Sequence, residues 1–239
     1  LNAIGVIHMV RSNKVKALEY YNRSFEIKEN IGDKVGMGQS LTNIGIIYMQ
    51  KGDSDLALEY LFRSLALKDE IVDKMGMGSS LLNIGIVYDK KGDYDKALKY
   101  LSRSLKIQEE LNYKLGIGYC LGGIGRVYDN MGEYDKALDY TFKALKIKEE
   151  LYNKRGIVLG FSNIGLIYSN KGDHTKAEEY LEESLSFQKE VDYDYIEETI
   201  LPTSYLYLSY KKLGKGYDKK EILRIIKEAD KIKFYPINF

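Results

Sequence analysis

Residue types that commonly perform chemistry are sparse in this chain. His8 and His174 could act as bases or metal ligands, but they lie far apart and neither has a sequence neighbour that would complete a site. Cys120 is the single cysteine, so the sequence offers neither an internal disulfide nor a thiolate metal site. We therefore predict no catalytic residues, no metal site and a protein that is not an enzyme.

Three glycine pairs could suggest phosphate-binding loops: Gly36-x-Gly38, Gly76-x-Gly78 and Gly116-x-Gly118. They lack a third glycine, recur at a fixed spacing and follow helical rather than strand segments. We therefore expect them to serve packing. The sequence predicts no cofactor and no small-molecule substrate.

Charge and hydropathy argue against two further classes of partner. The formal charge of the whole chain is +1, and residues 205–239 carry nine Lys and Arg against four Asp and Glu. This excess is too small to indicate nucleic-acid binding. No apolar run reaches the roughly 18 residues that a membrane span needs. The sequence predicts no nucleic-acid or membrane partner, and its low cysteine content favours a cytoplasmic location.

A 40-residue repeat dominates the sequence, because glycine, aromatic residues and alanine stay in phase over five copies. The glycines are Gly5, Gly45, Gly85, Gly125 and Gly165; the aromatic residues are His8, Tyr48, Tyr88, Tyr128 and Tyr168; the alanines are Ala17, Ala57, Ala97, Ala137 and Ala177. Such self-similarity predicts copies that stack and stabilise their neighbours.

Each copy has the pattern of two amphipathic helices. In the third copy, residues 78–91 and 94–111 carry apolar residues at steps of three and four, separated by Gly92 and Asp93. We expect Gly92 to end the first helix in a left-handed conformation and Asp93 to cap the second.

Small residues explain how the two helices pack. Gly45 and its equivalents lack a Cβ, so the second helix can approach closely, and Ala57 supplies a matching flat surface. Tyr48 is expected to fill the wedge between neighbouring helices.

These motifs resemble the tetratricopeptide repeat, with Leu41-x2-Ile44-Gly45-x2-Tyr48 followed by Ala57-x3-Leu61. Leu replaces the tryptophan of the family pattern, the late proline is absent, and the period is 40 rather than 34 residues. The long repeats are similar to those of Pins-type adaptors, kinesin light chains and bacterial sensor regions. The resemblance implies an all-α fold, a right-handed α-α superhelix of stacked antiparallel helix pairs.

We divide the chain accordingly. The expected repeats are 1–31, with its first helix truncated, 38–71, 78–111, 118–151 and 158–191, followed by a degenerate capping helix pair at 197–233 and a tail at 234–239. The tail is apolar enough to occupy a binding groove of its own chain, which we state as a hypothesis.

The resemblance further implies a partner-binding concave face lined by the first helices. By register, its candidate residues are Asn43, Ile46, Asn83, Ile86, Asp89, Lys90, Arg126, Asp129, Asn130, Asn163, Leu166 and Asn170. Asn43, Asn83 and Asn163, which precede the Ile-Gly motif or its equivalent, could instead hydrogen-bond neighbouring helix backbones. Arg126 could contact a ligand or form a salt bridge with Asp89 or Asp129.

At these positions the sequence departs from two known types of peptide-binding repeat, which limits the kinds of partner that we expect. The family's clamp for chaperone C-termini needs basic residues and asparagine where this face is mostly apolar. Pins-type arrays commonly place asparagine where this chain has Ile46, Ile86 and Leu166. A largely apolar groove remains, which suits an amphipathic helix or a mixed apolar and charged segment.

We therefore predict an interaction scaffold or adaptor that binds a peptide or helix of a partner protein. The alternative is a regulatory sensor region of a larger signalling protein, such as a histidine kinase, cyclase or transcription regulator.

Overall fold

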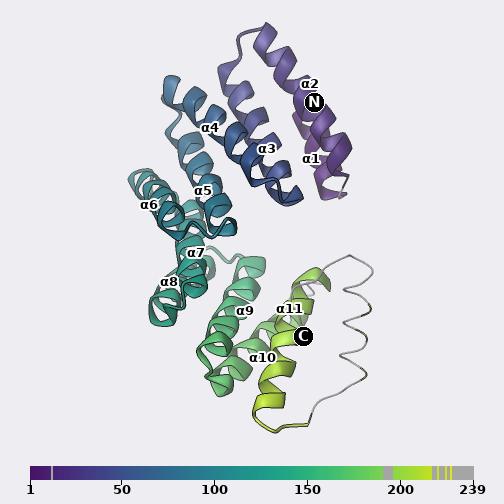
Figure 1. The fold of residues 1–239 in the computed structure, drawn as a ribbon, viewed down its shortest axis with the longest axis vertical. Coiled ribbons are helices and arrows are strands. Elements are labelled where there is room, and N and C mark those ends of the chain that lie inside the picture. The colour runs from purple at the N-terminus through teal and green to yellow at the C-terminus, as the bar shows by residue number, and fades with distance from the viewer. Residues whose placement is uncertain (12, 191–195, 217–219, 221–223, 225–226, 228–239) are drawn as a thin grey trace. The chain divides into compact units, whose positions relative to one another are not determined.

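The computed structural model describes the chain except for residues 12, 191–195, 217–219, 221–223, 225–226 and 228–239 (Figure 1). The described residues form 11 α-helices and no strand. They divide into two compact units, Leu1–Val127 and Tyr128–Phe239. Each unit is described by itself.

The helices alternate between the two types expected from the repeat. First helices are α1 (Asn2–Val10), α3 (Lys34–Lys51), α5 (Lys74–Lys90), α7 (Lys114–Asn130), α9 (Lys154–Lys171) and α11 (Ile196–Lys212). Second helices are α2 (Lys14–Asn30), α4 (Ser54–Glu70), α6 (Tyr94–Glu110), α8 (Tyr134–Glu150) and α10 (His174–Glu190). The expected tail 234–239 lies outside the described residues, as do most of the residues that follow α11 in the expected capping pair.

Neighbouring helices pack against each other within each unit. α3 packs on α4, α5 on α6 and α9 on α10, and neighbouring pairs meet through α2 and α3, α4 and α5, α8 and α9, and α10 and α11. First helices also contact one another, α3 with α5 and α9 with α11. The predicted all-α superhelical fold of helix pairs is confirmed.

Turn chemistry determines where the helices begin and end. Gly52 and Gly92 adopt φ of 83° and 76°, so each follows its helix in the left-handed region that glycine tolerates. Asp53 and Asp93 cap the second helices, and each side chain accepts a hydrogen bond from a backbone N–H three residues further on. The predictions made for Gly92 and Asp93 are confirmed.

The opposite turn, from a second helix to the next first helix, contains strained residues. Gly32 occupies a left-handed position there with φ of 71°, but its equivalents are Val72 at 57°, Asn112 at 50° and Tyr152 at 50°. A β-branched residue is disfavoured in this region because its Cβ crowds the following carbonyl. Val72 is also 73% exposed, so no packing offsets this strain.

Replacing this valine should stabilise the protein. We expect Val72→Asn to raise the free energy of unfolding by about 1 kcal/mol, because asparagine tolerates the left-handed region and already occupies the equivalent position 112. Urea titration of both proteins measures the change. The matched control is Gly32→Val, which should lower stability by a similar amount; an unchanged midpoint in both variants would contradict the assignment of strain.

Glycine and alanine make the close contact inside each helix pair. A Cβ built on Gly85 would lie 2.6 Å from Cγ of Leu101 and 3.2 Å from the carbonyl oxygen of Ala97. Leu101 and Ala97 are fully buried. The expected role of the glycine and alanine series is therefore confirmed for this pair, and Gly45 and Gly165 show the same arrangement against α4 and α10.

The aromatic series packs by stacking on the tyrosine of the adjacent second helix. Tyr88 and Tyr100 have ring centroids 5.4 Å apart with an interplanar angle of 5°. Lys96 lies over Tyr88 at 5.2 Å, and Arg103 over Tyr100 at 5.9 Å, so cations flank the stacked rings. His8 stacks on Tyr20 in the same way, which gives this histidine a packing role.

A buried lysine lies between neighbouring helix pairs of the first unit. Lys68 on α4 is only 4% exposed, and its Nζ donates to Oγ1 of Thr42 at 2.8 Å and to Oγ of Ser80 at 3.0 Å. Burial lowers the pKa of Lys68 to about 8, an effect that Asp73 partly opposes. This polar contact joins α3, α4 and α5 inside the stack.

Candidate partner-binding site on the first helices

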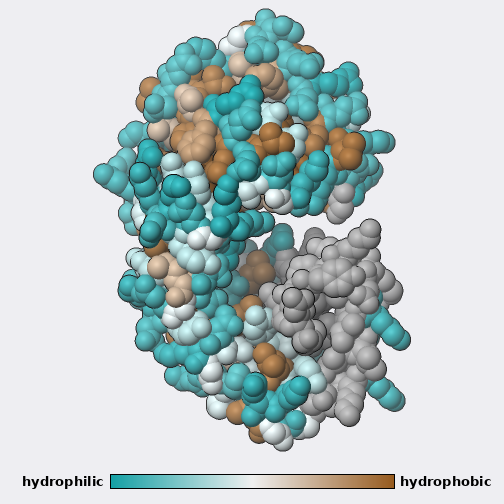
Figure 2. Space-filling model, in the orientation of Figure 1, coloured by the Kyte–Doolittle hydropathy of each residue, from teal (hydrophilic) through white to brown (hydrophobic). Residues whose placement is uncertain are grey.

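The predicted apolar residues lie on the partly exposed side of the first helices in the first unit. Ile46 on α3 and Ile86 on α5 are half-buried, whereas the adjoining Ile47 and Val87 are completely buried. We call the side of α3, α5 and α7 that carries Ile46, Ile86 and Arg126 the first-helix face. Over α1 to α5, Figure 2 shows hydrophobic residues scattered among hydrophilic ones.

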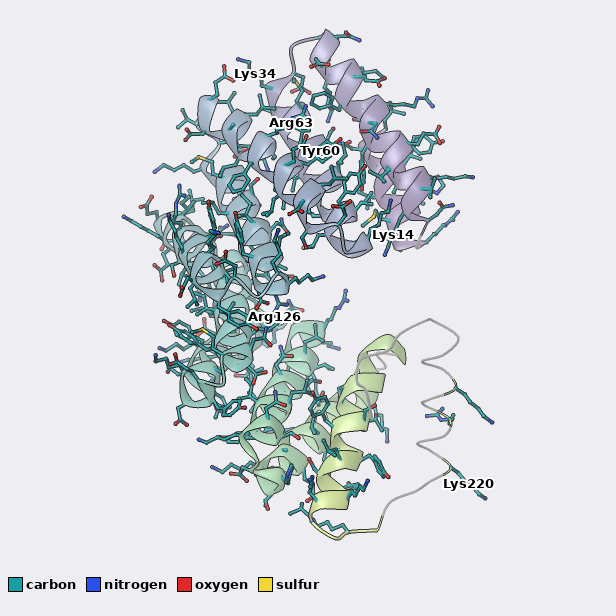
Figure 3. All side chains as sticks on the ribbon, viewed as in Figure 1. Lys14, Lys34, Tyr60, Arg63, Arg126 and Lys220 are labelled. Atoms are coloured by element: carbon teal, nitrogen blue, oxygen red, sulfur yellow. The ribbon has the colours of Figure 1, made fainter. Side chains whose placement is uncertain are left out.

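Arg126 is held in place by a buried carboxylate on the preceding first helix. Its Nε donates to Oδ2 of Asp89 at 2.7 Å (Figure 3 labels Arg126). The Asp89 side chain is 3% exposed and that of Arg126 is 48% exposed. Of the two possibilities stated for Arg126, the salt bridge with Asp89 is therefore present, and contact with a partner stays a prediction.

Lys90 lies beside this ion pair, and Lys14 lies near Lys90. Lys90 is the last residue of α5, and its pKa is lowered by burial and then by the neighbouring charges of Arg126 and Lys14, while Asp89 opposes these effects. Nζ of Lys14 donates to the backbone oxygen of Gln50 at 3.1 Å, near the C-terminal end of α3. The first-helix face is thus locally basic.

In the second unit, the predicted site residues make different contacts. Nδ2 of Asn170 on α9 donates to both carboxylate oxygens of Asp129, at 3.1 and 3.2 Å. Burial raises the pKa of Asp129, and this hydrogen bond opposes the shift. Leu166 packs beside Leu206 of α11 in the buried cluster around Ala177. Asn130 and Asn163 are exposed.

The asparagines that precede the Ile-Gly motif do not share one environment. Nδ2 of Asn83 donates to the backbone oxygen of Ser79 at 2.9 Å, one turn earlier in its own helix. Asn43 is half-buried. Asn83 therefore bonds the backbone of its own helix rather than that of a neighbouring helix. Contact of these asparagines with a peptide stays a prediction.

The glycine pairs receive long side chains from second helices. A Cβ on Gly76 would lie 2.8 Å from Cδ of Lys68, and one on Gly78 would lie 2.5 Å from Nε2 of Gln108. The carboxylate of Asp73 accepts from the backbone N–H of Gly76 at 2.9 Å, so a negative charge already caps this helix. The glycines provide space for packing, in agreement with the expectation from sequence.

Cys120 and His174, the remaining residues that could perform chemistry, lie in buried or half-buried positions within the helices. Cys120 is fully buried, its Sγ lies 3.1 Å from Oγ of Ser104, and burial raises the pKa of its thiol. His174 is the first residue of α10 and is half-buried. In the described part of the chain, no three metal-binding side chains gather, and no helix is long and apolar enough to cross a membrane.

Sequence reasoning missed the burial of Lys68, although a signal was present. Its register contains long polar residues in every copy: Lys28, Lys68, Gln108, Lys148 and Gln188. Periodic lysine and glutamine on a helix are easily read as a solvated face. The glycine pairs opposite them were the clue that these side chains point inward.

Comparison with known proteins identifies the repeat. A family model described as tetratricopeptide repeat matches residues 1–70 and 76–150, and a second model with the same description matches residues 161–190. No curated protein sequence matches the chain.

Several solved structures share the fold at low sequence identity. A Rap protein complexed with Competence and Sporulation Factor is 18% identical, with a TM-score of 0.82 over 98% of this chain and 64% of that chain. TPR-like repeats described as a kinesin light chain from Podosopora anserina are 16% identical, with a TM-score of 0.60 over 82% of this chain and 93% of that chain. A STAND signal transduction ATPase with a tetratricopeptide repeat sensor from Pyrococcus horikoshii is 22% identical, with a TM-score of 0.69 over 98% of this chain and 36% of that chain.

Proposed function

The chain belongs to the tetratricopeptide repeat family, and from this premise we propose that it binds a peptide or helix of a partner protein. The proposed site is the first-helix face of the first unit. A role as an interaction scaffold requires no chemical step, which agrees with the structural surroundings of His8 and Cys120.

One observation carries this proposal. On successive first helices, the same register presents two partly exposed isoleucines, Ile46 and Ile86, followed by a pinned arginine, Arg126. Side chains that merely stabilised the stack would be buried like Ile47 and Val87. A row of apolar side chains next to an oriented charge is the arrangement that amphipathic helices recognise in grooves.

Substitution on this row should strongly lower capture of the partner. We expect Ile46→Glu with Ile86→Glu to lower capture of the partner from lysate of the source organism at least tenfold, because two charges would enter the apolar row. Affinity capture followed by mass spectrometry compares the variant with wild type. Circular dichroism of both proteins checks that the variant remains folded.

A matched charge change elsewhere separates the site from a general effect. Ser102 and Lys106 are exposed residues of the second helix α6, so Ser102→Glu with Lys106→Glu should leave capture unchanged. The proposal fails if the α6 variant loses the partner while the first-helix variant retains it.

A second candidate is a sensor region that controls an effector domain of a larger protein. It is supported by the similarity to the ATPase with a repeat sensor, in which the matched part is 36% of that chain. In this role the bound segment would belong to an adjoining effector domain. The full open reading frame distinguishes the candidates, because a catalytic or DNA-binding domain beside the repeats favours the sensor and repeats throughout favour the adaptor.

A further inference from the structure

The first-helix face carries more positive than negative charge around Asp89. Arg126 is bonded to this carboxylate through Nε at 2.7 Å. Lys90 lies close enough to Arg126 and Lys14 for their charges to lower its pKa after the effect of burial. Arg126 and Lys90 therefore lie beside one buried carboxylate, and Lys14 adds a third positive charge near Lys90.

The charge of Lys14 is partly offset within the fold. Its Nζ donates to the backbone oxygen of Gln50 in the last turn of α3, where helix carbonyls carry partial negative charge. The excess positive charge is thus concentrated on Lys90 and Arg126. Both side chains remain accessible, since Lys90 is exposed and the Arg126 side chain is 48% exposed.

Arg126 is oriented in a way that suits recognition of a carboxylate. The buried Asp89 holds it through Nε, so the terminal nitrogens of the guanidinium are not needed for this bond. A guanidinium presents its donors in a rigid planar fork that binds carboxylates in pairs of hydrogen bonds. Because Asp89 already fixes the arginine, binding a carboxylate would cost little additional side-chain entropy.

Apolar surface adjoins the basic group on the same helices. Ile86 precedes Lys90 by one helical turn on α5, and Ile46 holds the same register on α3. A ligand that fits both features combines an acidic group with an apolar residue within about one turn. Free inorganic anions and nucleic acid backbones lack the apolar part.

We propose that the first-helix face of the first unit binds an acidic amphipathic segment of a partner protein. An Asp or Glu of that segment contacts the Arg126 fork beside Lys90, and its apolar side chains cover Ile86 and Ile46. This inference rests on the proposed function and adds the charge of the partner to it.

Designed peptides test the charge preference without knowledge of the natural partner. Three labelled helical peptides of about 20 residues share one leucine face and carry Glu, Gln or Lys on the polar face. Fluorescence anisotropy at constant ionic strength should show the Glu peptide binding about tenfold tighter than the Gln peptide, with the Lys peptide weakest. Lys90→Gln combined with Arg126→Gln and Asp89→Asn should remove this preference without leaving a buried charge unpaired.

The controls separate this inference from the proposed function. Lys106→Gln on α6 should leave all three affinities unchanged, and single-stranded oligothymidylate should compete poorly because it lacks an apolar face. Equal binding of the Glu and Gln peptides, both weakened by Ile86→Glu, would overturn the acidic preference and leave the proposed function standing. Oligothymidylate binding as tight as the Glu peptide would overturn the choice of a protein segment, and absence of binding by every peptide would overturn both proposals.

Discussion

Gly85→Ala is expected to destabilise the protein by about 2 kcal/mol, although alanine is the better helix former by about 1 kcal/mol. The added Cβ would lie 2.6 Å from Cγ of Leu101, an atom in the middle of a fully buried side chain, and 3.2 Å from the Ala97 backbone oxygen. α5 and α6 would have to separate to relieve this overlap. Urea titration followed by circular dichroism measures the change.

Gly123→Ala is the matched control, because its Cβ would contact the same leucine at a terminal methyl group, which can move more easily. It would lie 3.1 Å from Cδ2 of Leu101, the far end of the side chain, where a small rotation suffices. We expect its stability to stay within about 1 kcal/mol of wild type. Equal stability of Gly85→Ala and wild type would show that close approach of α5 and α6 is not needed.

The pH dependence of stability should reveal the buried charge of Lys68. The pKa of this lysine is about 8 in the folded protein, against 10.5 for an ordinary lysine. Below pH 8 it is charged in both states and its burial cost is fully present. Between pH 8 and 10.5 the folded state loses the proton first, so stability rises with pH.

Lys68→Gln should remove the part of this dependence that comes from Lys68, while Lys148, whose pKa burial also lowers, keeps its contribution. Between pH 7 and pH 9.5 we expect Lys68 to contribute a gain of about 2 kcal/mol in wild type that is absent in the variant. Glutamine fits the position, since Gln108 occupies the same register in the next repeat and is buried there. Lys106→Gln, on the exposed side of α6, should keep the wild-type slope; equal slopes for wild type and Lys68→Gln would contradict a charged, buried Lys68.

The fold was predictable because repetition shows which residues matter. The positions of Gly85, Ala97 and Tyr88 recur every 40 residues, so five copies of the repeat together indicate how one helix pair packs. Their contacts agree with that interpretation: Gly85 approaches Leu101 and Ala97, and Tyr88 stacks on Tyr100. Caps and left-handed glycines follow local rules that need no tertiary information.

The details of the site were not predictable, because they depend on choices between equivalent partners. Asp89 and Asp129 hold the same register, so the sequence could not decide which would pair with Arg126. The structure pairs Arg126 with Asp89 and Asp129 with Asn170. The burial of Lys68 likewise depends on space left by glycines of neighbouring helices.

Site-specific photocrosslinking in cells tests most directly whether the first-helix face binds a partner. A photoreactive phenylalanine analogue at position 86, on α5, is compared with the same group at position 106, on the exposed side of α6. We predict a crosslinked partner from position 86 that is absent from position 106 and lost when Ile46→Glu is added. A partner crosslinked from position 106 and not from position 86 would contradict the account.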